Sequence, residues 1–141
     1  MVSRSITAAA SLVALMLGVM ALESVAQAQS LRDARAREAT AAALGEEAVY
    51  TRIVCGNELR AEIDWSSAGD WQEGLLIAEC DKALGALEAA CRAGDKRAQN
   101  VSRFVCAGDG AGATLNGRSL RYGARADLNA FEETQKRFGA D

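Results

Sequence analysis

The sequence predicts an α+β domain in which a mostly antiparallel sheet of about four to five strands packs on one long central helix. A C-terminal helix and two disulfides complete the predicted fold. Three observations lead to this prediction. One long stretch has helical periodicity, shorter stretches on both sides of it alternate as strands do, and the chain contains four cysteines.

The stretch from Asp70 to Gly94 is expected to form the central helix. Asp70 followed by Glu73 fits a capping box, in which each side chain bonds a backbone N–H of the first turn. Gly94 stands where a left-handed residue would end the helix. An apolar stripe at helical spacing runs along this stretch and comprises Leu76, Cys80, Ala83, Leu84, Leu87 and Cys91.

The first residues have the composition of a cleaved export signal. Arg4 precedes an apolar run from Ile6 to Leu22, and Ala26-Gln27-Ala28 fits a small-residue cleavage site. We therefore expect a signal peptide over residues 1–28 and no stable membrane anchor after cleavage. The mature protein would be periplasmic or secreted, in a bacterial setting.

The segment that follows the signal is expected to be a helical or mobile arm over residues 29–48. Ser30 to Glu47 is rich in alanine and in charge, and its apolar face is thin. Docking of this helix on a partner is the alternative function for it. Residues 49–141 are then predicted to form a single disulfide-stapled domain.

Two strands are predicted before the central helix, over Val49–Cys55 and Leu59–Trp65. Both alternate between apolar and polar residues. Gly56-Asn57-Glu58 fits a three-residue hairpin loop, a length that keeps both apolar sets on one face of the sheet.

Further elements are predicted after the central helix. Asn100–Ala107 is expected to be a third strand, and Thr114–Leu120 a hairpin with Asn116-Gly117 in a type I′ turn. The last predicted helix would be capped by Asp127 or Asn129. Its narrow apolar stripe comprises Leu128, Phe131 and Phe138.

The disulfide pairing follows from the central helix. Cys80 and Cys91 share a face but lie about 16 Å apart along the axis, whereas a disulfide needs Cα atoms within roughly 7 Å. Each must therefore reach Cys55 or Cys106. The predicted order of elements places Cys55 level with Cys91 and Cys106 level with Cys80, which predicts the pairs Cys55–Cys91 and Cys80–Cys106. The sequential pairing, Cys55–Cys80 with Cys91–Cys106, is the alternative.

Composition limits the possible chemistry. The chain has 16 basic and 19 acidic residues, and this mild acidity argues against nucleic acid or an anionic membrane as the main partner. It has no histidine, which removes the usual general base and the commonest zinc ligand. No cysteine pair has the C-x-x-C spacing of redox or zinc motifs. The sequence therefore predicts no catalytic residue, no metal site and no cofactor.

Four residues are weak candidates for a binding site. Trp65 and Trp71 flank the turn into the central helix, where packing is favoured over carbohydrate stacking. Arg103 and Arg121 could gather on the sheet with other arginines and form an anion site. Because acidic residues are interspersed with them, a solvated charged face is favoured. The other arginines of this group are Arg52, Arg60 and Arg118.

Carboxylates offer the remaining candidate chemistry. Asp64 could pair with Asp70 and Glu73 for acid–base work, although a solvent-facing strand position and helix caps explain these residues better. The glycine-rich loop 108–112 lacks the Gly-Lys-Ser/Thr ending of a phosphate cradle and is predicted to be a flexible connection. The spacing around Asp109 does not support a calcium site.

A set of short motifs links the chain to a known group of proteins. They are Cys55-Gly56, Ile63-Asp64-Trp65, Cys80, Ala83-Leu84, Cys91 and Cys106. This layout resembles small exported four-cysteine proteins of bacteria, a group whose function is uncharacterised. The resemblance spans Cys55 to about Tyr122, and it implies export and disulfides but no activity.

Three functions are compatible with these observations. The favoured hypothesis is an exported, non-catalytic binding or envelope-accessory protein whose partner is another exported or envelope protein. The second hypothesis is an inhibitor or immunity-type protein that blocks a partner enzyme. The third is a small carboxylate-dependent hydrolase, which would need two carboxyl groups within about 10 Å of each other in a cleft.

Overall fold

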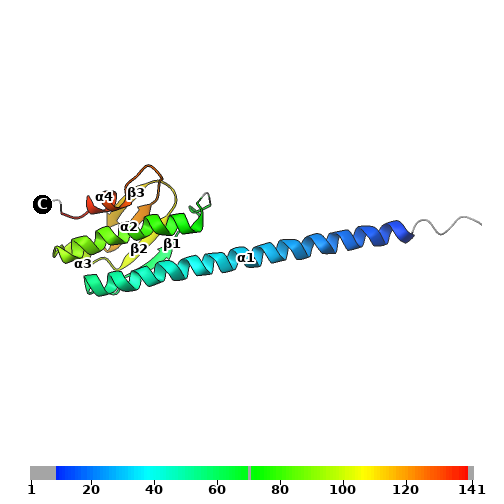
Figure 1. Ribbon diagram of the computed structural model, residues 1–141, viewed down its shortest axis with the longest axis horizontal. Helices are drawn as coiled ribbons and strands as arrows, with labels where there is room; N and C mark the ends of the chain where they lie inside the picture. Colours follow the sequence, from blue (N-terminus) through cyan, green and yellow to red (C-terminus); the bar gives the residue numbers. More distant parts are fainter. Residues whose placement is uncertain (1–8, 70, 140–141) are drawn as a thin grey trace, which may run out of the picture. The chain divides into compact units, whose positions relative to one another are not determined.

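The computed structural model describes residues 9–69 and 71–139, with side chains from residue 24 onward except that of Glu73. Figure 1 shows the elements, which in chain order are α1 (Ala9–Cys55), β1 (Arg60–Ile63), α2 (Glu73–Arg92), α3 (Lys96–Gln99), β2 (Arg103–Ala107), β3 (Gly112–Asn116), β4 (Ser119–Gly123) and α4 (Ala130–Gln135).

The chain divides into two units at a boundary inside α1. The first ends at Ala36, and its described residues 9–36 are helical, with exposed side chains from residue 24 to residue 35. The second unit comprises Arg37–Asp141 and contains the sheet, both disulfides and the core. Within the described residues, no helix combines the length and the apolarity that a membrane crossing requires.

The α+β class is confirmed, with a four-stranded sheet in the order β1-β2-β4-β3. The sheet is mixed rather than mostly antiparallel, because β2 pairs in parallel with both β1 and β4, and only β3 and β4 are antiparallel. The reason is the connection through α2. A helix that follows a strand returns the chain to the end where that strand began, so the next strand runs parallel to it.

The core lies between α2 and one face of the sheet, and Figure 1 shows α2 lying across the strands. The predicted stripe of α2 is buried, with Cys80, Leu84 and Leu87 at 0% exposure. The inward residues of the strands are equally buried and comprise Phe104, Cys106, Leu120 and Tyr122. The face predicted from helical periodicity is therefore the face that packs on the sheet.

The strand predicted over Val49–Cys55 is wrong, because these residues form the last turns of α1. Its β-branched residues favour a strand. Packing against α2 favours the helix instead. The residues buried there have helical spacing and are Leu44, Ala48, Thr51 and Cys55. Gly56, with φ of 64°, follows the end of α1, so the predicted hairpin loop is instead a helix-to-strand turn. The predicted arm over residues 29–48 is part of the same helix.

The ends of α2 agree only in part with the prediction. Gln72 is the N-cap residue and makes no side-chain cap hydrogen bond, so the capping box is not present; Asp70 lies outside the described residues. Gly94 ends the helix as predicted, with φ of 84°. Gly94 N–H donates to the Cys91 carbonyl and Asp95 N–H to the Ala90 carbonyl, both at 3.0 Å, which is the Schellman pattern.

The C-terminal elements lie where they are predicted, although Phe131 of the predicted apolar stripe is 37% exposed. The third strand and the hairpin are confirmed as β2 and β3–β4. The turn differs in type: Gly117 has φ of 56°, and no described residue other than glycine has positive φ. This is the φ pattern of a type II′ turn, with glycine first and Arg118 second. Asn129 caps α4, accepting a 3.2 Å hydrogen bond from Glu132 N–H.

Both predicted disulfides are confirmed. Cys55 bonds Cys91 with a Cα–Cα distance of 5.1 Å, and Cys80 bonds Cys106 with a Cα–Cα distance of 5.7 Å. The first ties the end of α1 to the end of α2, and the second ties α2 to β2. Because α2 is unbroken between Cys80 and Cys91, its two cysteines fasten different elements to it.

Candidate functional site

The face of the sheet that points away from α2 carries polar side chains over a small apolar floor. Glu62, Arg103, Thr114 and Asn116 are exposed on it. A hollow of about 440 Å³ lies on this face and is lined by Glu62, Asp64, Arg103, Val105, Thr114, Asn116, Ser119 and Arg121. We call this surface the open sheet face.

Strand register explains how these residues meet. Glu62 of β1 is opposite Val105 of β2, Val105 is opposite Arg121 of β4, and Arg121 is opposite Thr114 of β3. Because residues in register share one face, these four side chains form a row across the whole sheet. Val105 is only 8% exposed, so the charged residues stand around a nearly buried apolar centre.

Arg121 joins two carboxylates that follow neighbouring parallel strands. Its guanidinium donates to Asp109 Oδ1 at 3.2 Å and Oδ2 at 2.6 Å, and to Asp64 Oδ2 at 3.3 Å. Asp64 comes directly after β1, and Asp109 lies in the loop after β2. The carboxyl ends of parallel strands meet at one edge of a sheet, which brings the two residues together.

The same hydrogen bonds keep both carboxylates ionised. The Ser66 hydroxyl donates to Asp64 Oδ1 at 2.5 Å, and this bond and that from Arg121 lower the pKa of Asp64 below its usual value. The hydrogen bond from Arg121 lowers the pKa of Asp109 in the same way. Glycoside hydrolysis needs one carboxyl group that stays protonated. Arg121 brings Asp64 and Asp109 close together. Because the pKa of each is lowered, neither is a suitable proton donor.

The arginines gather on the sheet only in part. Arg60, Arg103 and Arg121 lie on the strands, whereas Arg52 lies on α1 and Arg118 in the hairpin turn, where it donates to the Asn100 carbonyl at 3.1 Å. Arg103 forms an ion pair with Glu62, and both side chains are more than half exposed. Exposed pairs of this kind contribute at most about 1 kcal/mol. The geometry is that of a charged, solvated face and not of an anion site.

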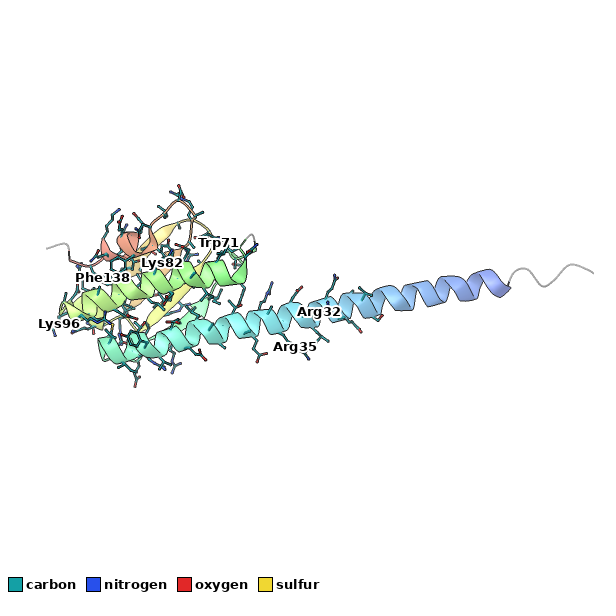
Figure 2. The ribbon with its side chains drawn as sticks, viewed as in Figure 1. Arg32, Arg35, Trp71, Lys82, Lys96 and Phe138 are labelled. Atoms are coloured by element: carbon teal, nitrogen blue, oxygen red, sulfur yellow. A yellow bond between two sulfur atoms is a disulfide. The ribbon has the colours of Figure 1, made fainter. Side chains whose placement is uncertain are left out.

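The two tryptophans lie together in a different place. With Arg37, Ala68, Gly69 and Leu76 they line a pocket of about 120 Å³. The Arg37 guanidinium carbon lies 5.4 Å from the centre of the Trp65 ring. Figure 2 shows Trp71 beside the N-terminal end of α2. The sequence offers no signal for Arg37 as a site residue, because it lies far along the chain from both tryptophans, in the segment predicted to be an arm.

The loop predicted to be flexible is anchored on both sides. Gly108 N–H donates to the Ser67 hydroxyl at 3.0 Å, and the Gly108 carbonyl accepts from Trp71 Nε1 at 3.1 Å. Asp109 is held by Arg121 and also accepts a 3.2 Å hydrogen bond from Ala111 N–H. The loop thus connects the tryptophan pocket to the open sheet face.

The described side chains include no group of three or more histidine, cysteine, aspartate or glutamate residues placed to hold a metal ion. Comparison of the chain with protein-family models, with curated proteins and with solved structures found no match. The geometry of the second unit is therefore the basis for any functional proposal.

Proposed function

We propose that the chain is an exported, non-catalytic binding protein that holds another exported or envelope protein on its open sheet face. Export is supported by the predicted signal peptide over residues 1–28. The two disulfides also support it, because such bonds persist in oxidising compartments such as the periplasm or the extracellular medium.

One observation carries the choice of surface. The central strand β2 is parallel to its neighbours on both sides, and its outward face has no helix of the described chain packed on it. Parallel strands are normally covered on both faces. A partner placed on the open sheet face would supply the second layer that this arrangement usually has.

The charges of the open sheet face indicate the chemistry of the partner. Arginines and carboxylates are balanced there, with Arg60, Arg103 and Arg121 beside Glu62, Asp64 and Asp109. A balanced face is a poor match for the uniform negative charge of nucleic acid or anionic lipid. It fits a protein surface that carries both signs, where complementary pairs give specificity more than affinity.

Site-specific photo-cross-linking in the native envelope tests this proposal. A benzophenone amino acid at Thr114, exposed on β3, should cross-link to one reproducible protein partner. The matched control carries the same group at Lys82, which is exposed on α2, and should not yield that product. Arg103→Glu should lower the yield from position 114 at least about fivefold. The glutamate would then face the negative group of the partner that pairs with the arginine, and like charges repel.

The proposal would be overturned by no product from position 114 or by the same product from position 82. Products that contain only a second copy of the chain would also contradict it. If the captured partner is an enzyme, its activity with and without the chain distinguishes an inhibitor from an envelope-accessory protein.

A further inference from the structure

We propose that the pocket between Trp65 and Trp71 binds a small apolar carboxylate, with the apolar group inside and the carboxylate on Arg37. This site is separate from the open sheet face and does not depend on the proposed function. Four features of the described residues support it: the size of the pocket, the contacts that hold its walls, the position of Arg37 and the chemistry of the walls.

The size of the pocket selects the apolar group. Its volume is about 120 Å³, and small residues at Ala68 and Gly69 leave this space free. A Cβ placed on Gly69 would meet nothing within 4 Å. An apolar cavity of roughly 150 Å³ can hold benzene. A branched aliphatic group of four carbons is slightly smaller than benzene and therefore matches the space.

Hydrogen bonds and close contacts of the described residues hold the walls of the pocket. Trp71 donates to the Gly108 carbonyl, and a Cβ on Gly108 would lie 2.6 Å from Trp71 Cδ1, so the ring rests directly on this glycine. Leu76 is 1% exposed and anchored in the core. Trp71 N–H donates to the Ala68 carbonyl at 3.1 Å. A preformed pocket avoids the entropy cost of ordering its side chains on binding.

Arg37 provides the anchor for the charge. Its guanidinium carbon lies 5.4 Å from the centre of the Trp65 ring, a cation–π distance, and Arg37 lines the pocket. A guanidinium can bind a carboxylate at two points through its N–H groups. Among the described side chains, Arg37 takes part in none of the ion pairs.

The same contact argues against two other ligand classes. A cationic ligand would be repelled by Arg37, which already lies over one face of the Trp65 ring. A sugar ring needs an open aromatic face on which to stack, and Trp71 is half-buried with its N–H already used. An apolar carboxylate uses both the apolar walls and the free donors of Arg37.

Intrinsic fluorescence offers a direct test, because Trp65 and Trp71 are the only tryptophans in the chain. The probe is 4-methylpentanoate, with its uncharged amide as the matched ligand, titrated into the full chain at neutral pH. The carboxylate should give a saturable change and bind at least about tenfold more tightly than the amide, as expected for a charge-assisted pair. No saturation, or equal affinity for the two ligands, would overturn the proposal.

Three variants sharpen the test. Arg37→Gln should reduce the preference for the carboxylate to below about twofold, whereas Arg52→Gln, elsewhere on α1, should preserve it. Ala68→Leu should fill the pocket and abolish binding of both ligands. If Arg37→Gln fails to fold, the comparison of acid and amide on the unaltered chain still decides.

A second pair of probes identifies the source of the carboxylate. The tripeptide Gly-Gly-Leu and its C-terminal amide present the same apolar group on a polypeptide end. Tighter binding of the peptide acid than of 4-methylpentanoate assigns the pocket to a polypeptide terminus, and the reverse order assigns it to a free acid.

Discussion

Thr51 of α1 donates a 2.8 Å hydrogen bond to the Glu88 carboxylate of α2, and both side chains are buried. The Thr51 hydroxyl oxygen also lies 3.2 Å from the carbonyl oxygen of Glu47. One turn further along α1, the disulfide of Cys55 fastens the same two helices. A polar contact and a covalent bond thus hold the end of α1 against α2.

Thr51→Val should lower the free energy of unfolding by about 1–3 kcal/mol, because the buried Glu88 carboxylate loses a hydrogen-bond donor. Thr51→Ser retains the hydroxyl and serves as the control, with a smaller loss. Urea unfolding at neutral pH, followed by circular dichroism with both disulfides intact, measures the difference. Equal stability of the Val and Ser variants would contradict the assigned role of this bond.

Gly108→Ala should lower stability by about 1–3 kcal/mol, the usual range for forcing a methyl group into a packed site. The added Cβ would lie 2.6 Å from Trp71 Cδ1 and 2.7 Å from the Ser67 carbonyl oxygen, so the loop has to move. Tryptophan emission during urea unfolding reports both the loss of stability and the displacement of the Trp71 ring.

Gly45→Ala provides the opposite case for comparison. Gly45 lies inside α1, and a Cβ there meets nothing within 4 Å, so the variant should gain up to about 1 kcal/mol. If both alanine variants change stability in the same direction, close packing at Gly108 is not the cause.

Asp81→Asn should raise stability at neutral pH by a few tenths of a kcal/mol, the size of a like-charge pair on a helical surface. The negative charge of Asp81 raises the pKa of Glu47 above its usual value of 4.5. A raised carboxyl pKa means that stability is fully present below 4.5 and declines as the pH rises through the folded-state pKa. The gain in Asp81→Asn should therefore vanish near pH 3 in urea titrations at several pH values.

Asp109→Asn should act in the opposite direction. Hydrogen bonds from Arg121 lower the pKa of Asp109 below 3.8, so its contribution to stability is present above that value and is lost as the pH falls. The variant should be less stable than the unaltered chain at pH 7, by up to about 1 kcal/mol for a solvent-accessible pair. The two proteins should converge as the pH falls below 3.8. A difference that persists there would indicate that packing, and not charge, is responsible.

The disulfide pairing was predicted correctly although the strand that led to it was wrong. A strand and a helix ending at Cys55 both deliver this residue to the turn at Gly56, at the same end of the domain as Cys91. The disulfide pairing depends only on the position of that turn. The distance that separates Cys80 from Cys91 along one helix excludes their joining in either case.

The direction of the strands could not be predicted in the same way. Alternation of apolar and polar residues is identical in parallel and antiparallel strands. The pairing of β2 with β1 and β4 depends on how α2 and the β3–β4 hairpin return the chain. This path cannot be predicted from the sequence of any single segment.

Some residues of the candidate sites are likewise placed by local sequence, and others are brought together only by the fold. Alternation places Arg103 and Arg121 on the strands, and the turn signals place Trp65 and Trp71 near α2. The grouping of Asp64, Asp109 and Arg121 depends on two loops that meet only in the folded domain. The contact of Arg37 with Trp65 likewise joins residues that are remote along the chain.

The sequence by itself determined where α2 runs and where it ends, that its two cysteines bond elsewhere, and that a strand and then a hairpin follow it. These features depend on neighbours within a few residues, where backbone geometry converts spacing directly into direction. Tertiary structure alone decided that Val49–Cys55 is helical, that β1, β2 and β4 run parallel, and which charges meet at Arg121. Such outcomes depend on contacts between segments distant along the chain, and packing between them can outweigh local preference.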